Sequence, residues 1–130
     1  MLAPRVVLLD LDGTLVDASD AIVDGVLALA AETGLTVPSP DWVRNRIGQP
    51  PDETWALLGA DDPKAVSQAF IERYVPGLPD RTRVLPGVIE ALDALQEFGA
   101  TLALVTTRTT SSARETLMAL KLDGWISEII

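Results

Sequence analysis

Two aspartates, two residues apart, are the residues of this chain best suited to chemistry. Asp10 and Asp12 follow a short apolar run, and Gly13 and Thr14 come directly after them. Because side chains alternate along a strand, the two carboxylates are expected on one side of the chain, a few ångströms apart. Such carboxylates repel each other unless a cation or a shared proton lies between them. With oxygen ligands only, the natural cation is Mg²⁺.

This pair of carboxylates could carry out phosphoryl transfer. One Asp carboxylate can accept a phosphoryl group as an aspartyl-phosphate. A second carboxylate beside it can protonate the leaving oxygen and then deprotonate the attacking water. Gly13 permits a sharp turn whose N–H groups can hold a phosphate. The alternative is an ordinary acidic strand-to-turn junction, where Asp and Gly are common; the buried apolar strand before the motif favours the functional interpretation.

Composition excludes several other chemistries. The 130 residues contain no cysteine and no histidine, which removes disulfides, thiolates and histidine acid–base catalysis. The formal net charge of −9 argues against nucleic acid or an anionic membrane as a partner. A phosphate site must therefore obtain positive charge locally, from a metal, from Arg or from backbone N–H groups. No apolar run reaches membrane-spanning length and the N-terminus lacks the layout of a signal peptide, which predicts a cytoplasmic location.

The order of elements predicts an α/β fold with a helical insertion. Residues 6–9 and 101–106 are expected to form buried strands, and residues 125–130 a third strand of the same parallel sheet. Residues 17–83 show only helical patterns, and Ser19 is the expected cap of the first helix. Two more helices are expected after Gly87 and after a cap at Ser111 or Ser112.

This order divides the chain into two parts. Residues 1–16 and 84–130 are expected to form a partial Rossmann-like parallel sheet of about three strands with its helices. Residues 17–83 are expected to form a helical-bundle cap inserted after the first strand. Because ligands of open α/β sheets bind at the carboxyl ends of the strands, the loops after the first two strands are the expected site.

The segment from Asp10 to Asp17 resembles the first signature of the haloacid dehalogenase-like phosphatases, in the branch that includes phosphoglycolate phosphatase and β-phosphoglucomutase. Families of this branch insert a helical cap after that motif. The resemblance implies that Asp10 is the nucleophile and a Mg²⁺ ligand. It implies that Asp12 is the general acid/base and binds Mg²⁺ through its backbone carbonyl, with Gly13 and Thr14 in substrate binding. Asp12 also points away from the dehalogenases themselves, which lack an acidic residue there.

The second signature of the family is a strand that ends in Thr or Ser, and residues 101–106 resemble it. The resemblance implies that Thr106 hydrogen-bonds the phosphate. Thr107 and Arg108 are further candidates for substrate binding because Arg108 follows the Thr106–Thr107 turn; a surface charge is the alternative for Arg108. A strand-end threonine without any function is the alternative, but the helix that precedes this strand favours the functional interpretation. In the cap, the segment that begins at Arg44 resembles the one that closes over substrate, and Arg44 is the candidate there; a solvated helix end is the alternative.

The family pattern continues beyond what this chain contains. Its third signature, a Lys, and its fourth, an acidic pair on a later strand, normally follow a segment like 125–130, so the chain is expected to be truncated at its C-terminus. The sheet would then keep an exposed edge or face. That exposure predicts low stability, or self-association as a homo-oligomer through the exposed core surface.

The leading hypothesis is Mg²⁺-dependent hydrolysis of a small phosphorylated metabolite through an aspartyl-phosphate intermediate. A sugar-phosphate mutase similar to β-phosphoglucomutase would use the same residues. The third hypothesis is a catalytically incomplete fragment or binding module.

Overall fold

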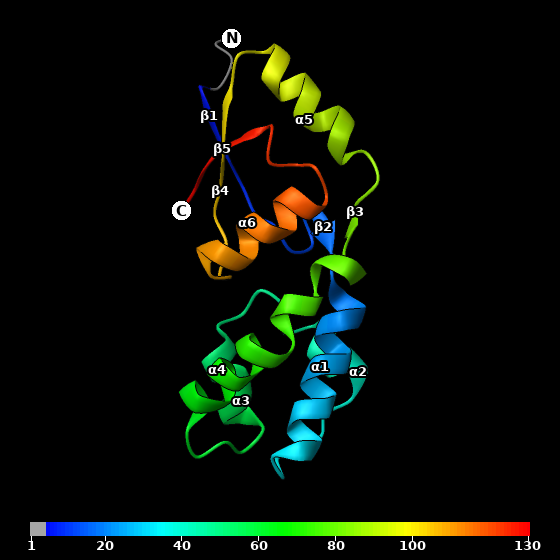
Figure 1. Cartoon of the computed structure of the whole chain (residues 1–130), viewed down its shortest axis with the longest axis vertical. Coiled ribbons are helices and arrows are strands. Elements are labelled where there is room, and N and C mark those ends of the chain that lie inside the picture. Colours follow the sequence, from blue (N-terminus) through cyan, green and yellow to red (C-terminus); the bar gives the residue numbers. More distant parts are fainter. Residues whose placement is uncertain (1–4) are drawn as a thin grey trace. The chain divides into compact units, whose positions relative to one another are not determined.

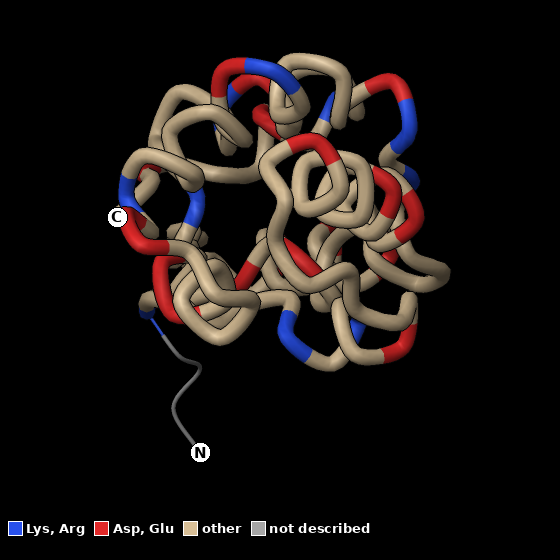
Figure 2. The backbone as a smooth tube through the Cα atoms, turned by 90° about the horizontal axis from the view of Figure 1, so that it is seen from below, with Lys and Arg blue, Asp and Glu red and all other residues tan. Residues whose placement is uncertain are grey.

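The computed structural model describes residues 5–130, which divide into two compact units (Figure 1). The first unit combines the chain up to Asp17 with Thr82–Ile130, and the second is Ala18–Arg81. Acidic residues are spread over both units rather than gathered in one segment (Figure 2). Within residues 5–130, no helix is both long enough and apolar enough to cross a membrane.

The first unit contains a parallel sheet of three strands, in the order β1-β4-β5. The strands are β1 (Val6–Leu9), β4 (Thr101–Leu104) and β5 (Ile126–Ile129). Helix α5 (Val88–Glu97) precedes β4, and α6 (Thr110–Ala119) connects β4 to β5. The predicted α/β fold with a parallel, three-stranded sheet is therefore confirmed.

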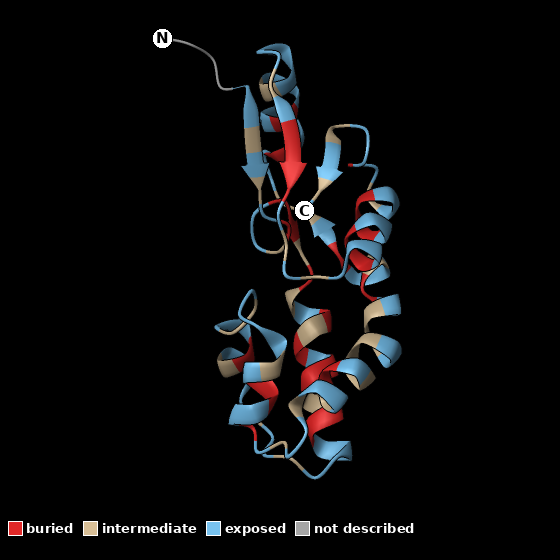
Figure 3. Cartoon of the chain, turned by 90° about the vertical axis from the view of Figure 1, so that its left-hand side faces the viewer, coloured by how far each residue is buried: buried red, intermediate tan, exposed pale blue. Residues whose placement is uncertain are grey.

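The strands of this sheet differ in burial: β1 is exposed to half-buried, whereas β4 is buried from Leu102 to Leu104 (Figure 3). The register pairs Val6 with Thr101 and Leu8 with Ala103, so these side chains share one face. On that face Val6 is 57 % exposed and Leu8 is 61 % exposed. The expectation that residues 6–9 form a fully buried strand is therefore wrong for one of its faces. Ala103 on the same face is buried, so the open part of the face is the one formed by β1. Parallel sheets are normally covered on both faces, which makes this exposure of β1 unusual.

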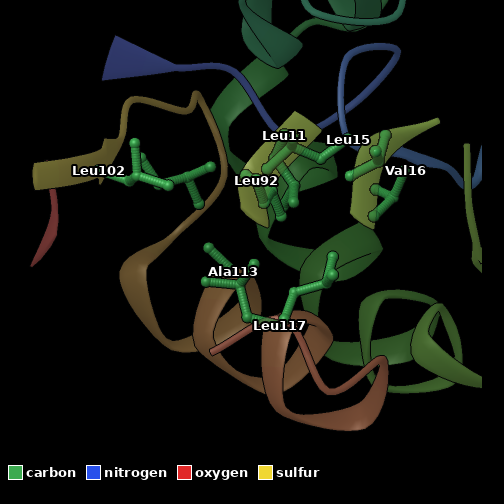
Figure 4. Packing of buried hydrophobic residues seen from close by; sticks show 10 residues of the cluster. Leu11, Leu15, Val16, Leu92, Leu102, Ala113 and Leu117 are labelled. Carbon is green, nitrogen blue, oxygen red and sulfur yellow. The ribbon is translucent and has the colours of Figure 1, made fainter. Parts of the chain in front are cut away.

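The other face of the sheet carries the core of the first unit. By register, the side chains of β1 and β4 on this face are Val7, Leu9, Leu102 and Leu104. They pack in one hydrophobic cluster with Leu92 of α5 and Leu117 of α6, both almost fully buried. Figure 4 shows Leu92, Leu102 and Leu117 of this cluster. Both helices therefore contribute to the core on the same face of the sheet.

The second unit is built from helices. They are α1 (Ser19–Glu32), α2 (Pro40–Arg44), α3 (Pro51–Leu57) and α4 (Pro63–Arg73), followed by the 3-10 turns η1 (Val75–Gly77) and η2 (Pro79–Arg81). The unit has its own hydrophobic cluster, in which Leu29, Val43 and Trp55 are buried and Phe70 packs against them. The ring centroid of Phe70 lies 5.9 Å from the ring centroid of Trp55 and 5.5 Å from that of Tyr74.

Several boundaries differ from the sequence expectation. Helix α1 begins at Ser19 itself, with Ala18 before it and no side-chain cap. Helix α6 is capped by Thr109, whose Oγ1 accepts from the N–H of Ser112, and not by either serine. Strand β4 ends at Leu104, two residues earlier than expected. The residues from there to the start of α6 consequently form a loop.

A short antiparallel ladder, absent from the sequence expectation, lies where the chain passes between the units. It pairs β2 (Val16–Asp17) with β3 (Arg83–Val84). Two residues per strand are too few to produce a recognisable alternation, so the sequence shows no sign of either strand.

Candidate active site

The carboxyl end of β1 leads into a tight loop built around one buried residue, Leu11. The carbonyl of Leu11 accepts hydrogen bonds at 3.3, 3.0 and 3.2 Å from the N–H groups of Thr14, Leu15 and Val16. Gly13 adopts a φ of +79°, a left-handed conformation that glycine takes without steric cost, and its N–H donates to the Val16 carbonyl at 2.8 Å. The N–H groups of Gly13 and Thr14, which the sequence analysis assigned to substrate, are thus engaged within the loop.

Asp10 lies at the entrance of this loop, immediately after β1. Its Oδ1 accepts a hydrogen bond from the N–H of Leu11 at 2.7 Å, and the residue as a whole is exposed. The bond fixes one oxygen of the carboxylate to the buried backbone of the loop. Asp10 is therefore held in place while remaining accessible to a molecule from solvent.

Asp12 is bound by Arg108 from the loop that follows β4. The Arg108 Nε donates to Oδ2 at 2.8 Å and the Nη2 donates to Oδ1 at 2.6 Å. The two side chains are only 10 % and 13 % exposed. A guanidinium that meets both oxygens of a carboxylate forms one of the strongest and most directional contacts between side chains.

Arg108 is itself fixed by Thr116 of α6. Its Nη1 donates to the Thr116 Oγ1 at 2.9 Å, and Thr116 is fully buried. The sequence analysis missed Thr116. A polar residue beside the inward-facing Leu117 is the signal that could have identified it, because a buried hydroxyl in a helix requires a partner.

The loop after β4 brings Thr106 to the same edge of the sheet as Asp10. The N–H of Val105 donates to the carbonyl of Leu9 at 2.8 Å, which joins the ends of β4 and β1. The Thr106 Oγ1 accepts from the backbone N–H of Arg108 at 3.2 Å and so shapes the turn. Its hydroxyl proton is left to donate. Thr107 is exposed in the same turn.

Arg44, the remaining candidate, belongs to the second unit. Its Nη2 lies 2.8 Å from the Oδ1 of Asp20, and its Nη1 donates to the Ser19 hydroxyl at 3.1 Å. These contacts tie the end of α2 to the start of α1. They are contacts within one unit, whereas the other candidates gather in the first unit.

The oxygen donors at the end of β1 suit a hard cation. Within the described part of the chain, no three His, Cys, Asp or Glu residues form a group that could hold a metal ion. Arg108 engages both oxygens of Asp12, so the exposed carboxylate of Asp10 and nearby backbone carbonyls are the oxygen donors most open to a cation. Such a sparse oxygen set fits Mg²⁺, which keeps several waters and is often held by one or two carboxylates together with substrate phosphate.

Comparison with known proteins identifies the family of this chain. The sequence profile of the haloacid dehalogenase-like hydrolases matches residues 7–130, which include both loops of the site. The chain belongs to the haloacid dehalogenase-like hydrolase family. The resemblance seen in the sequence around Asp10 and Asp12 is thereby confirmed.

The relatives of this haloacid dehalogenase-like chain include named phosphatases. A phosphoglycolate phosphatase of Agrobacterium fabrum is 34 % identical over 128 residues, covering 92 % of this chain and 55 % of the relative. One from Caulobacter vibrioides is 30 % identical over 129 residues, covering 93 % of this chain and 54 % of the relative. The chain thus spans about half the length of these curated relatives.

Solved structures give the same result for the fold. A haloacid dehalogenase-like family hydrolase from Streptococcus pneumoniae superposes with a TM-score of 0.89 at 25 % identity, covering 99 % of this chain and 61 % of that protein. A protein described as a predicted phosphoglycolate phosphatase from Haemophilus somnus gives 0.83 at 28 % identity, covering 100 % and 63 %. The fold of this haloacid dehalogenase-like chain is therefore that of the corresponding part of longer proteins.

Proposed function

We propose that this chain carries the nucleophile and the general acid/base of a phosphomonoester hydrolase. The main support is that Asp10 is exposed, while the carboxylate of Asp12, two residues later, is held by Arg108 from the neighbouring loop. In this proposal, residues 1–16 and 84–130 form the phosphatase core. Residues 17–83 form a cap, in which Arg44 contributes to substrate binding.

The reaction would proceed in two steps, phosphoryl transfer to Asp10 and hydrolysis of the aspartyl-phosphate. An oxygen of the Asp10 carboxylate attacks phosphorus, the ester bond to the leaving oxygen breaks, and Asp12 donates the proton that completes the product alcohol. Water then attacks the aspartyl-phosphate while Asp12 takes back a proton, which releases inorganic phosphate and restores the Asp10 carboxylate. Thr106, Thr107 and the hydroxyl of the exposed Thr14 would donate to the phosphate oxygens, while Gly13 would shape the turn that presents Thr14.

Mg²⁺ is the cation proposed for this site. The Asp10 carboxylate and the backbone carbonyl of Asp12 would hold it, and water would fill its other positions. When bound, it would neutralise charge on the transferring phosphoryl group. Because the protein supplies so few ligands, we expect weak binding that improves when a phosphate is present.

The proposed substrate class is a small phosphorylated metabolite. Relatives named phosphoglycolate phosphatase are the support for this class, and 2-phosphoglycolate is therefore the first compound to test. Since this chain spans about half of those proteins, the test must use the 130-residue chain itself.

The deciding experiment measures phosphate release from a panel of small phosphomonoesters, with Mg²⁺ and with excess EDTA. We expect turnover only with Mg²⁺, and none in Asp10→Asn. Asp123→Asn is the matched control, because Asp123 is also an exposed aspartate of the first unit, located after α6. Mass spectrometry of acid-quenched wild type should find a phosphoryl group on the peptide containing Asp10. Persistent turnover in Asp10→Asn would refute the assignment of the nucleophile.

A further inference from the structure

We propose that Arg108 is a positioning residue: it orients the carboxylate of Asp12 for proton transfer and does not bind the substrate phosphate. This inference rests on the proposed function of Asp12 as the general acid/base. Many active sites combine a nucleophile, an acid/base group beside it and a third group that orients the acid/base group. Here the three would be Asp10, Asp12 and Arg108.

The geometry of the contact restricts Asp12 to a single orientation. Arg108 donates from Nε and Nη2 to the two different oxygens of the carboxylate, at 2.8 and 2.6 Å. A single hydrogen bond would let the carboxylate rotate about its own axis, but a planar fork that holds both oxygens fixes that rotation as well. The loop after β4 thereby determines where the oxygens of Asp12 lie at the end of β1.

Arg108 is equipped to impose this orientation because it is itself fixed. Its side chain is 10 % exposed, and its third bond, from Nη1, goes to a fully buried Thr116 on α6. Five further ion pairs link described residues, and in each of them at least one side chain is more than half exposed. Exposed pairs of that kind restrict their partners little. The Asp12–Arg108 pair thus stands apart from the remaining ion pairs between described residues.

The contact leaves Asp12 able to exchange a proton. An ionised carboxylate has about four acceptor positions, two on each oxygen. Arg108 uses one on each oxygen, so each retains one for a water or a leaving oxygen. An orienting role is therefore compatible with acid–base work by the same carboxylate.

The same contacts argue against Arg108 as a phosphate ligand. Three of its five N–H groups are already engaged, all of them with protein atoms. To meet a phosphate with the Nε and Nη2 side of its guanidinium, Arg108 would have to leave Asp12. That movement would leave a carboxylate only 13 % exposed without its cation, which is costly.

Kinetics of four variants would distinguish these roles. We expect Arg108→Gln to lower kcat by about 100-fold, the loss typical of a misplaced reacting group, while KM changes little. Arg108→Lys should lower kcat by about tenfold, less than Arg108→Gln, because Lys keeps the positive charge but not the planar fork. Thr116→Val should show a smaller loss in kcat. Arg114→Lys, an exposed arginine of α6, is the control that should change neither constant. A raised KM with unchanged kcat in Arg108→Lys would overturn the proposal, because it indicates lost substrate binding.

A second readout does not depend on turnover. The ¹⁵N-labelled Arg108 Nε–H signal, assigned by its disappearance in Arg108→Lys, reports on the contact with Asp12 directly. We expect its hydrogen exchange to become about tenfold faster in Asp12→Asn, as the loss of a hydrogen bond to a charged group predicts, and to stay slow when millimolar orthophosphate is added. Unchanged exchange in Asp12→Asn, or a signal that moves with orthophosphate, would overturn the proposal. A wild-type chain without turnover would refute the proposed function for this chain, and the exchange measurement would then decide the role of Arg108 alone.

Discussion

Asp17 and Arg83 lie opposite each other in the ladder of β2 and β3, with the Arg83 Nη2 3.0 Å from the Asp17 Oδ2. The adjacent pair of the ladder is Val16 with Val84, and Val16 is fully buried. This ladder lies where the chain leaves the first unit and where it returns. Besides its backbone pairing, the ladder includes two side-chain contributions of different physical kinds, an ion pair with an exposed arginine and a buried valine.

The ion pair of the ladder should contribute much less to stability than the buried valine. The Arg83 side chain is 76 % exposed, so we expect Arg83→Ala to lower the free energy of unfolding by less than about 1 kcal/mol. Val16→Ala removes two buried methyl-sized groups and should cost about 2 kcal/mol. Urea unfolding of both variants checks the ranking, and a larger loss in Arg83→Ala would contradict it.

Gly25, in the middle of α1, should be intolerant of even a methyl group. A Cβ at this position would lie 2.9 Å from the Phe70 Cε2 and 3.1 Å from the Tyr74 Cγ. Alanine would gain about 1 kcal/mol in helix propensity, but overpacking typically costs about 1–3 kcal/mol. We therefore expect Gly25→Ala to lower the free energy of unfolding by about 1 kcal/mol, measured by urea unfolding.

The control for Gly25→Ala is the same substitution made in the Phe70→Leu variant. In Phe70→Leu the closest atom is removed while the contact with Tyr74 remains, so the loss caused by Gly25→Ala should be smaller than in the wild type. An equal loss in both backgrounds would show that the aromatic ring is not the cause.

The sequence could predict the parts of the site that depend on neighbours along the chain. Asp10, Asp12 and Gly13 lie within four residues, and their place after an apolar run determines the edge of the sheet at which they lie. Thr106 follows a second run of the same kind. Parallel pairing of β1 with β4 then joins the two loops, as the bond from Val105 to Leu9 demonstrates.

The sequence could not predict contacts that depend on the exact ends of the elements. Asp12 and Arg108 are 96 residues apart, and the guanidinium reaches the carboxylate from a loop that exists because β4 ends at Leu104. Thr109 rather than a serine caps α6, although all three have the hydroxyl that a cap requires. In both cases several residues had suitable chemistry, and three-dimensional packing selected one.

Tyr74 should titrate above the ordinary tyrosine value. Burial is the main cause that raises its pKa, and the hydrogen bond and charge of Glu32 raise it further, while nearby Arg73 lowers it. The folded state thus holds the phenolic proton more tightly than the unfolded state. The resulting stability is fully present below the unfolded pKa of about 10 and is lost as the pH rises through the higher folded pKa.

Tyr74 is the single tyrosine of the chain, so phenolate absorbance reports its titration directly. Its hydroxyl donates to the Glu32 Oε1 at 3.2 Å. Glu32→Gln should therefore lower its pKa toward the ordinary value, whereas Glu97→Gln, an exposed glutamate on α5, should leave it unchanged. Equal titration curves for wild type and Glu32→Gln would contradict this explanation.

The open face of the sheet should drive self-association of the chain. Val6 and Leu8 of the edge strand β1 are more than half exposed there, and exposed strand edges with apolar side chains are sites of pairing between molecules. Sedimentation velocity of the wild type should show a concentration-dependent increase in size, and Leu8→Lys should reduce it. Leu57→Lys is the matched control, because Leu57 of the second unit is 63 % exposed and Leu8 is 61 % exposed. A wild type that stays monomeric at all concentrations, or an equal effect of both substitutions, would exclude this face as the cause.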